Sequence, residues 1–140
     1  MNKLIFLLLL CLPTFAGAYW TSGNELNSQL TAVPSNFYAE GSAVGYITAI
    51  ADKASRDKAT LLEMLSMGEE LTPNDRQKLL MRFASNHTCF PKGVTVGQLE
   101  AIVKKWLSLH PARWNEAAVD LVEEALRESF PCKSVNDFLK

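Results

Sequence analysis

The residues in this sequence that are best suited to chemistry are its histidines and cysteines. His87 lies two residues before Cys89, and a cysteine beside a histidine can act as a nucleophile with its general base. No third group that would orient the imidazole is evident, and a cysteine held in a disulfide cannot attack a substrate. His110 precedes Pro111 at the end of a predicted helix, where histidines commonly interact with exposed carbonyl groups. The pattern therefore predicts that the protein is not an enzyme.

Metal, cofactor and nucleic-acid sites are not predicted either. The sequence has no HExxH or CxxC spacing, no clustered carboxylates and no glycine-rich phosphate loop. The formal net charge of -1 provides no basic surface for nucleic acid or for anionic lipids. Hydrophobic residues make up 48% of the chain, which favours a packed core over disorder. We expect a binding protein without a cofactor.

The first eighteen residues have the form of a cleaved secretory signal peptide. Lys3 precedes an apolar stretch, Leu4–Phe15, and Ala16-Gly17-Ala18 supplies the small side chains that signal peptidase accepts. The apolar stretch is too short to span a bilayer, which needs about 20 residues. A lipoprotein signal at Cys11 is the weaker interpretation, because a leucine precedes that cysteine. We expect export to the periplasm, with no stable membrane association after cleavage.

Cleavage after Ala18 removes Cys11 and leaves Cys89 and Cys132. Two cysteines in an exported chain are most simply interpreted as one disulfide, because the periplasm is oxidising. Two buried free thiols are the alternative. On the loop-entropy model a crosslink of this span stabilises the fold by roughly 4 kcal/mol.

Helical periodicity recurs along the mature chain, and no segment alternates like a strand. Capping signals support several helix starts, notably Thr72-Pro73 and Thr95 with Gln98. Gly41 and Gly45 are typical of close helix packing. The predicted helices are a short one from Ser22 that ends before Pro34, then Tyr38–Lys53, Asp57–Met67, Pro73–Asn86, Val96–Leu109 and Ala112–Ser129.

These elements predict an all-α fold, a compact bundle of about five to six helices in one domain, residues 19–132. Residues 133–140 are expected to form a loosely held tail. Cys89 lies just before one long helix and Cys132 just after the next. If these two helices pack antiparallel, the disulfide staples the open end of a C-terminal helical hairpin.

The same region carries a recognisable pattern. It consists of Cys89-Phe-Pro-Lys-Gly-Val-Thr95, then Gln98–Val103, Leu109-His-Pro111, Ala118–Leu126 and Phe130-Pro-Cys132, with Gly45-Tyr-Ile-Thr-Ala-Ile50 upstream. The pattern resembles the type VI secretion amidase-immunity family, also called resistance-associated or Tai-type immunity proteins. The resemblance covers about residues 41–132. It departs from the family at Ala49, where glycine is usual, in having no further mature cysteines, and in a longer segment between residues 58 and 82.

The resemblance implies a periplasmic helical protein, often a homodimer. Characterised relatives block the active-site cleft of a peptidoglycan amidase that neighbouring cells deliver. The departures from the family pattern bear on which partner is bound. Two alternatives are an acid-stress chaperone of the HdeA kind and an orphan family member with another binding role.

Two loops are candidates for contacting such a partner. The first is the acidic turn at residues 68–75, which could complement a basic rim around a catalytic cleft. The second is the loop at residues 87–95. A solvated turn and ordinary core packing are the alternative roles. The candidate contact residues are Glu69, Glu70, Asn74, Asp75, His87, Phe90 and Lys92.

Overall fold

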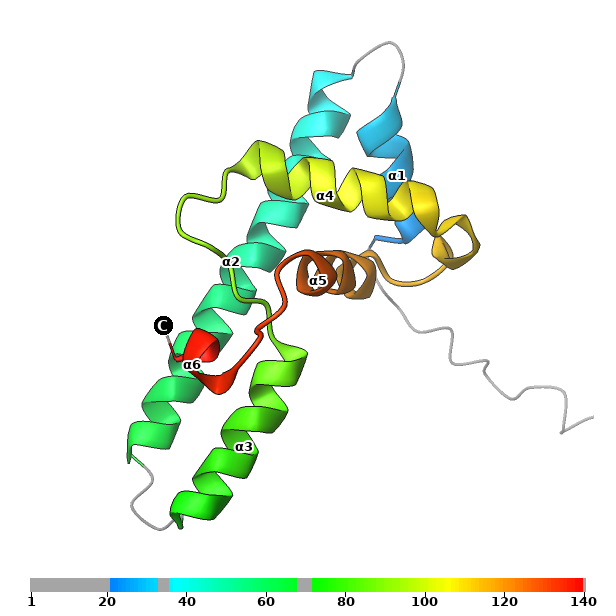
Figure 1. Cartoon of the computed structure of the whole chain (residues 1–140). Coiled ribbons are helices and arrows are strands. Elements are labelled where there is room, and N and C mark those ends of the chain that lie inside the picture. The colour runs from blue at the N-terminus through cyan, green and yellow to red at the C-terminus, as the bar shows by residue number, and fades with distance from the viewer. Residues whose placement is uncertain (1–20, 33–35, 68–71, 140) are drawn as a thin grey trace, which may run out of the picture.

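Six α-helices and a short 3-10 helix form the part of the chain that a computed structural model describes, residues 21–32, 36–67 and 72–139 (Figure 1). Within these ranges no residue lies in a β-strand, so the predicted all-α class is confirmed. The predicted signal peptide and the Glu69-Glu70 turn lie outside the described residues. The elements are α1 (Gly23–Thr31), α2 (Phe37–Met67), α3 (Pro73–Asn86), α4 (Val96–Leu109), η2 (Pro111–Arg113), α5 (Ala118–Ser129) and α6 (Val135–Phe138).

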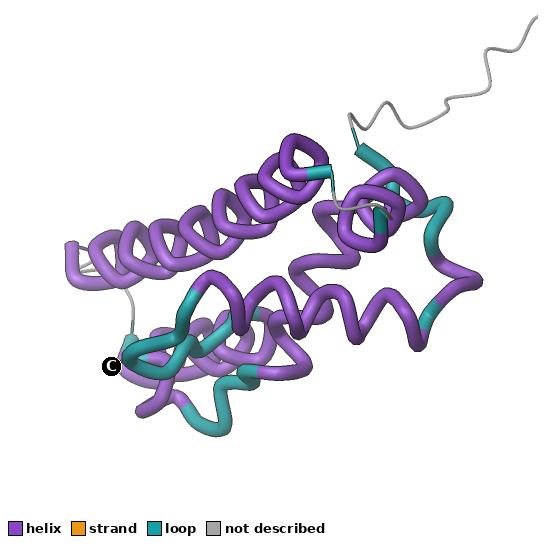
Figure 2. The backbone as a smooth tube through the Cα atoms, turned by 90° about the horizontal axis from the view of Figure 1, so that it is seen from above, coloured by secondary structure: helices purple, strands orange, loops and turns teal. Residues whose placement is uncertain are grey.

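The long helix α2 runs through the whole molecule and organises it into two parts. Helices α1, α4 and α5 pack around its first half, whereas α3 and α6 lie beside its second half (Figures 1 and 2). We call the second half of α2 with α3 and α6 the arm. The main core lies in the first part and is built from aliphatic side chains and one indole: Leu26, Leu30, Ala43, Ile47, Ile50, Ala51, Leu99, Val103, Trp106, Leu107, Ala118, Leu121, Val122, Ala125 and Leu126.

Helix α2 corrects the prediction of two separate helices over residues 38–53 and 57–67. It continues without a break from Phe37 to Met67. The polar residues between the two predicted helices are compatible with a helix, because Lys53 pairs with Asp57 one turn later and Ser55 donates to the carbonyl of Ala51. The apolar face of α2 is interrupted after Ala51, because the helix extends beyond the main core at this point.

The predicted helix starts at Ser22, Thr72 and Thr95 are confirmed. The Ser22 and Thr72 hydroxyls accept hydrogen bonds from the backbone N–H groups of Glu25 and Asp75. Thr95 and Gln98 form a complete capping box at the start of α4. These starts were predictable because the atoms that satisfy the first N–H groups lie within three residues of the cap.

The helix predicted over residues 112–129 begins later, at Ala118. Before it, η2 and a turn bring residues 114–118 against the beginning of α1. Gly23 donates to the carbonyl of Glu116 at 3.0 Å, and Ala118 donates to that of Thr21 at 2.9 Å. These bonds to a distant segment compete with helical hydrogen bonds, which explains why helix periodicity placed the start too early.

The glycines predicted to allow close helix packing do not do so. A Cβ atom added at Gly41 or Gly45 would meet no other atom within 4 Å, and both residues are exposed. The close approach occurs at Gly23, where an added Cβ would lie 2.4 Å from Leu121 Cδ1 and 2.9 Å from the carbonyl oxygen of Trp114. Gly23 therefore lets α1 lie against α5.

The C-terminal segment was expected to form a loosely held tail, whereas in the structure it packs back against the helices. Residues 135–138 form α6, and the side chain of Phe138 is fully buried. The Phe138 ring packs edge-on against His87, with 5.5 Å between centroids, and Lys58 Nζ lies 5.4 Å from its centroid. Phe138 therefore connects α6 to α2 and to the end of α3.

Helices α4 and α5 pack together as predicted, and Cys89 and Cys132 form the predicted disulfide, with 5.0 Å between their Cα atoms. Figure 1 shows α4 along its length and α5 almost end-on, so the two helices cross. Among the described residues, no helix is long and apolar enough to cross a membrane.

Candidate interaction surface

The loop between α3 and α4 is fixed at its base. Cys89 is joined to Cys132, and its backbone N–H donates to the carbonyl of Phe130 at 2.8 Å. Thr88 and Pro131 form an isolated antiparallel bridge beside it. The Phe90 ring packs on that of Phe130, with 5.6 Å between centroids. The loop is therefore held to the end of α5 by covalent, polar and apolar contacts.

The tip of this loop is a tight turn that presents Pro91 and Lys92 to solvent. The Val94 N–H donates to the Pro91 carbonyl at 3.4 Å, and Gly93 has a φ of 84°. This is the geometry of a type II turn, whose third position favours glycine because other side chains are strained there. The turn thus places Lys92 at the exposed tip of the loop.

Three surface hollows surround the loop, and we call them together the loop groove. The first, of about 300 Å³, lies between α2 and the loop base and is lined by Ser55, Lys58, Ala59, Leu62, Thr88 and Phe90. The second, of about 460 Å³, is lined by Lys58, Cys89, Phe90, Pro91, Lys92, Pro131, Lys133 and Asp137. The third, of about 410 Å³, is lined by Pro91, Lys92, Gly93, Val94, Gln98, Ala101, Ile102 and Phe130.

The predicted contact residues fall into two places. His87, Phe90 and Lys92 lie in or beside the loop at residues 87–95, whereas Asn74 and Asp75 lie exposed in the first turn of α3, at the far end of the arm (Figure 1). Glu69 and Glu70 lie outside the described residues. Among the described residues, the structure therefore does not bring Asn74 and Asp75 to the loop at residues 87–95.

His87 has a structural role in this arrangement. Its Nδ1 lies 2.8 Å from the carbonyl oxygen of Phe83, and its ring packs edge-on against those of Phe83 and Phe138. Because a carbonyl oxygen only accepts hydrogen bonds, Nδ1 carries a proton. The histidine thereby connects the C-terminal end of α3 to α6.

Two further lysines of this surface, Lys58 and Lys133, were not predicted from the sequence. Lys58 comes from the second half of α2 and Lys133 from the segment after α5, yet both line the same hollow as Lys92. A signal was present, because Lys133 follows Cys132 directly and Lys92 comes three residues after Cys89. The cysteine pairing alone places these two lysines near each other.

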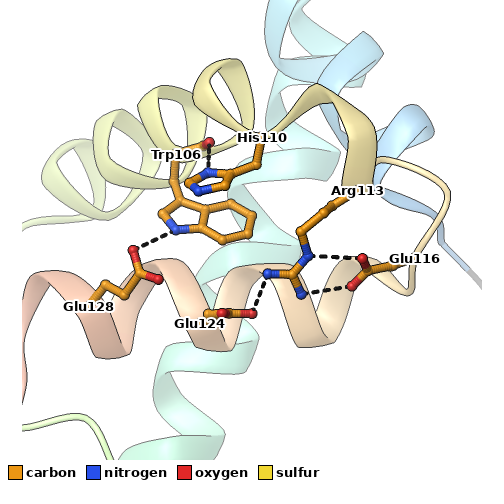
Figure 3. A network of polar contacts seen from close by, with 6 residues as sticks. All are labelled: Trp106, His110, Arg113, Glu116, Glu124 and Glu128. Carbon is orange, nitrogen blue, oxygen red and sulfur yellow. Dashed lines mark hydrogen bonds and ion pairs between the residues drawn. The ribbon is translucent and has the colours of Figure 1, made fainter.

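A second polar cluster joins α4, η2 and α5 (Figure 3). Trp106 Nε1 donates to Glu128 Oε2 at 2.8 Å, and the His110 ring stacks on the indole with 4.0 Å between centroids. Arg113 donates to Glu116 at 2.8 and 2.7 Å and pairs with Glu124 at 2.8 Å. These paired groups connect the three elements, so we interpret the cluster as structural.

Electrostatics within this cluster follow from the pairing. Hydrogen bonds to Glu116 and then to Glu124 raise the pKa of Arg113 above its ordinary value. The hydrogen bond from Arg113 lowers the pKa of Glu116. Both shifts favour the charged forms, as expected for a bidentate pair near the surface. His110 donates from Nδ1 to the Trp106 carbonyl, 2.8 Å away, which matches its predicted role at the helix end.

Among the described residues no group of three or more histidine, cysteine or acidic side chains is placed to hold a metal ion. No curated protein and no solved structure matches this chain. The family model of Rap1a immunity proteins matches residues 22–132, which include the main core, the disulfide and all lining residues of the loop groove except Lys133 and Asp137. The chain therefore belongs to the Rap1a immunity protein family.

Proposed function

We propose that this protein is exported to the periplasm, where it binds and blocks a peptidoglycan amidase delivered by a type VI secretion system. Membership in an immunity family supports the binding of a secreted toxin. The signal-like first eighteen residues support export, and the sequence resemblance described above supports an amidase as the target.

The observation that carries the proposal is the rigid presentation of the loop at residues 87–95. An inhibitor that enters a catalytic cleft loses less entropy when the inserted segment is already ordered. Here the disulfide and the Cys89–Phe130 hydrogen bond hold the loop base, and the turn at residues 91–94 holds its tip. We propose that this tip occupies the cleft of the amidase and excludes the peptidoglycan strand.

The test is an inhibition assay with the mature chain, residues 19–140, purified with its disulfide intact. Each type VI amidase effector from the same genome is incubated with purified sacculi, and the release of cleaved peptide is measured. We expect one effector to lose activity in proportion to the added protein, with an end point set by stoichiometry. If no amidase effector is bound or inhibited, the proposed target is wrong.

Export and assembly are tested separately. Mass spectrometry of periplasmic extract should find a chain that begins at Tyr19, and an uncut chain confined to the cytoplasm would contradict export. Light scattering after size-exclusion chromatography should find the homodimer that the resemblance implies. A monomer at all concentrations would contradict that part of the proposal without affecting inhibition.

A further inference from the structure

We propose that the loop groove receives a protein segment in which an apolar side chain is flanked by carboxylates, and that this segment belongs to the toxin. The inference rests on the proposed function and specifies the chemistry of the partner. It reverses the charge pattern expected from the sequence, in which an acidic turn of this protein would meet a basic rim.

Neighbouring hollows of the groove adjoin one another, because they share lining residues. The first and second share Lys58 and Phe90, and the second and third share Pro91 and Lys92. We therefore expect a single extended segment to follow the loop from the second half of α2 to α4. The volumes of the hollows, about 300 to 460 Å³, fall in the range of sites that hold side chains or small ligands.

The end of the groove near α4 is apolar. Val94, Ile102 and Phe130 line it, and each is only half-buried against the core. Gln98 and the loop backbone supply its polar edge. A partner residue such as leucine or phenylalanine would cover these side chains and remove their remaining apolar surface from water.

The middle of the groove is cationic. Lys58, Lys92 and Lys133 line one hollow, against a single lining carboxylate, that of Asp137. Asp137 accepts a hydrogen bond from the Ser134 hydroxyl at 3.1 Å, and its single charge offsets only part of that of the three lysines. The whole chain carries a formal charge of -1, so this concentration of positive charge is local. Carboxylates on a partner would complement it.

Lys58 is the fixed member of the three. Its ammonium group lies 5.4 Å from the centroid of the buried Phe138 ring, a cation–π arrangement that restrains a long side chain. Lys92 and Lys133 are exposed and line the same hollow as Cys89 of the disulfide. The groove therefore combines one restrained cation with two adaptable ones.

Two peptides test this chemistry by NMR on the oxidised mature chain labelled with 15N. Both peptides have fifteen residues with leucine at the centre, flanked by glutamates in one and by lysines in the other. We expect the acidic peptide alone to shift the amide signals of Lys58, Lys92, Val94 and Ile102. Shifts confined to other surfaces, or equal shifts with the basic peptide, overturn the proposal.

Charge reversal provides the matched comparison. The triple variant Lys58→Glu, Lys92→Glu, Lys133→Glu should bind the acidic peptide at least about tenfold more weakly. The same change at the exposed lysines 78, 104 and 105, which do not line the groove, should leave binding within about twofold of the parent. The double variant Lys92→Glu, Lys133→Glu keeps Lys58 and serves if the triple variant does not fold. Equal weakening by both triple variants overturns the proposal.

The amidase assay separates this inference from the proposed function. If the parent inhibits an amidase and the groove variant inhibits it equally well, the inference fails and the proposed function stands. If no amidase is inhibited, the proposed target fails while the peptide experiment still tests the groove. Stronger binding to vesicles of phosphatidylglycerol than to the acidic peptide would assign the groove to lipid and overturn the proposal.

Discussion

The indole nitrogen of Trp106 donates a 2.8 Å hydrogen bond to Glu128, which connects the end of α4 to the end of α5. The indole is almost completely buried, with 6% of its surface exposed. Truncation in Glu128→Ala leaves this donor without its acceptor and should lower the free energy of unfolding by about 1–3 kcal/mol. Urea denaturation followed by tryptophan fluorescence measures the change. Glu128→Gln retains an acceptor oxygen and should recover most of the loss, so equal destabilisation by both variants would contradict the role of the hydrogen bond.

Gly23 and Gly41 should respond to alanine in opposite directions. At Gly23 the new methyl group meets Leu121 and the Trp114 backbone, so we expect a loss of about 1–3 kcal/mol. At Gly41 the methyl group meets open space inside a helix, so we expect a gain of about 0.5–1 kcal/mol. Thermal unfolding of the two variants checks both signs, and equal effects would refute the close approach at Gly23.

Phe138 should stabilise the arm much more than its neighbour does. Its ring is fully buried against His87, and Phe138→Ala should cost about 3–5 kcal/mol where the cavity cannot collapse. Leu139 is 48% exposed, so Leu139→Ala should change stability by less than about 0.5 kcal/mol. Hydrogen exchange should show faster exchange in α3 and α6 of the first variant only. Unchanged protection there would mean that α6 does not hold the arm.

The Arg113–Glu116 pair predicts a dependence of stability on pH. The pKa of Glu116 is lower in the folded state, so the unfolded chain takes up the proton first as the pH falls. Its contribution is complete above the ordinary glutamate pKa and is lost as the pH falls through the lower folded value. Glu116→Gln should remove this part of the acid dependence, measured as unfolding free energy between pH 7 and acid. Glu40→Gln, at an exposed site on α2, is the control and should retain the parent's dependence.

Removal of the disulfide should loosen the loop at residues 88–95 while the helices of the main core remain folded. In Cys89→Ser, Cys132→Ser the loop-entropy model gives a loss of roughly 4 kcal/mol. Neither cysteine belongs to the main core of α1, α2, α4 and α5, so we expect the far-ultraviolet circular dichroism to stay helical at low temperature. Amide exchange should accelerate first at residues 88–95. Uniform loss of protection throughout the chain would show that the crosslink supports the whole fold.

Local signals in the sequence predicted the helix starts at Ser22, Thr72 and Thr95, because a cap and its partner lie within one turn. They could not predict the start of α5, where the competing hydrogen bonds come from residues 21–24. The continuity of α2 depends on its exit from the core, which is a tertiary property. Phe138 was predicted to lie in a loosely held tail, because the groups that pack on its ring, His87 and Lys58, are distant from it in the sequence.

Only the part of the candidate surface that is local in the sequence could be predicted. His87, Phe90 and Lys92 lie within three residues of Cys89, so the cysteine motif in the sequence pointed to them directly. Lys58 and Ile102 reach the groove only through the packing of α2 and α4 against the loop. Their spacing in the sequence carries no signal of this proximity.

The isolated β-bridge between Ser22 and Ala117 determines where a tag or linker can be attached to the protein. It anchors the first described residues beside α5, on the opposite side of the molecule from the loop, whereas the C-terminal end lies on the same side as the loop (Figure 1). An affinity tag or surface linker attached before Thr21 therefore leaves the loop groove open. The same attachment after Leu139 lies close to α6, whose Asp137 lines the groove, so the two positions of the tag provide a steric comparison without changing any native residue.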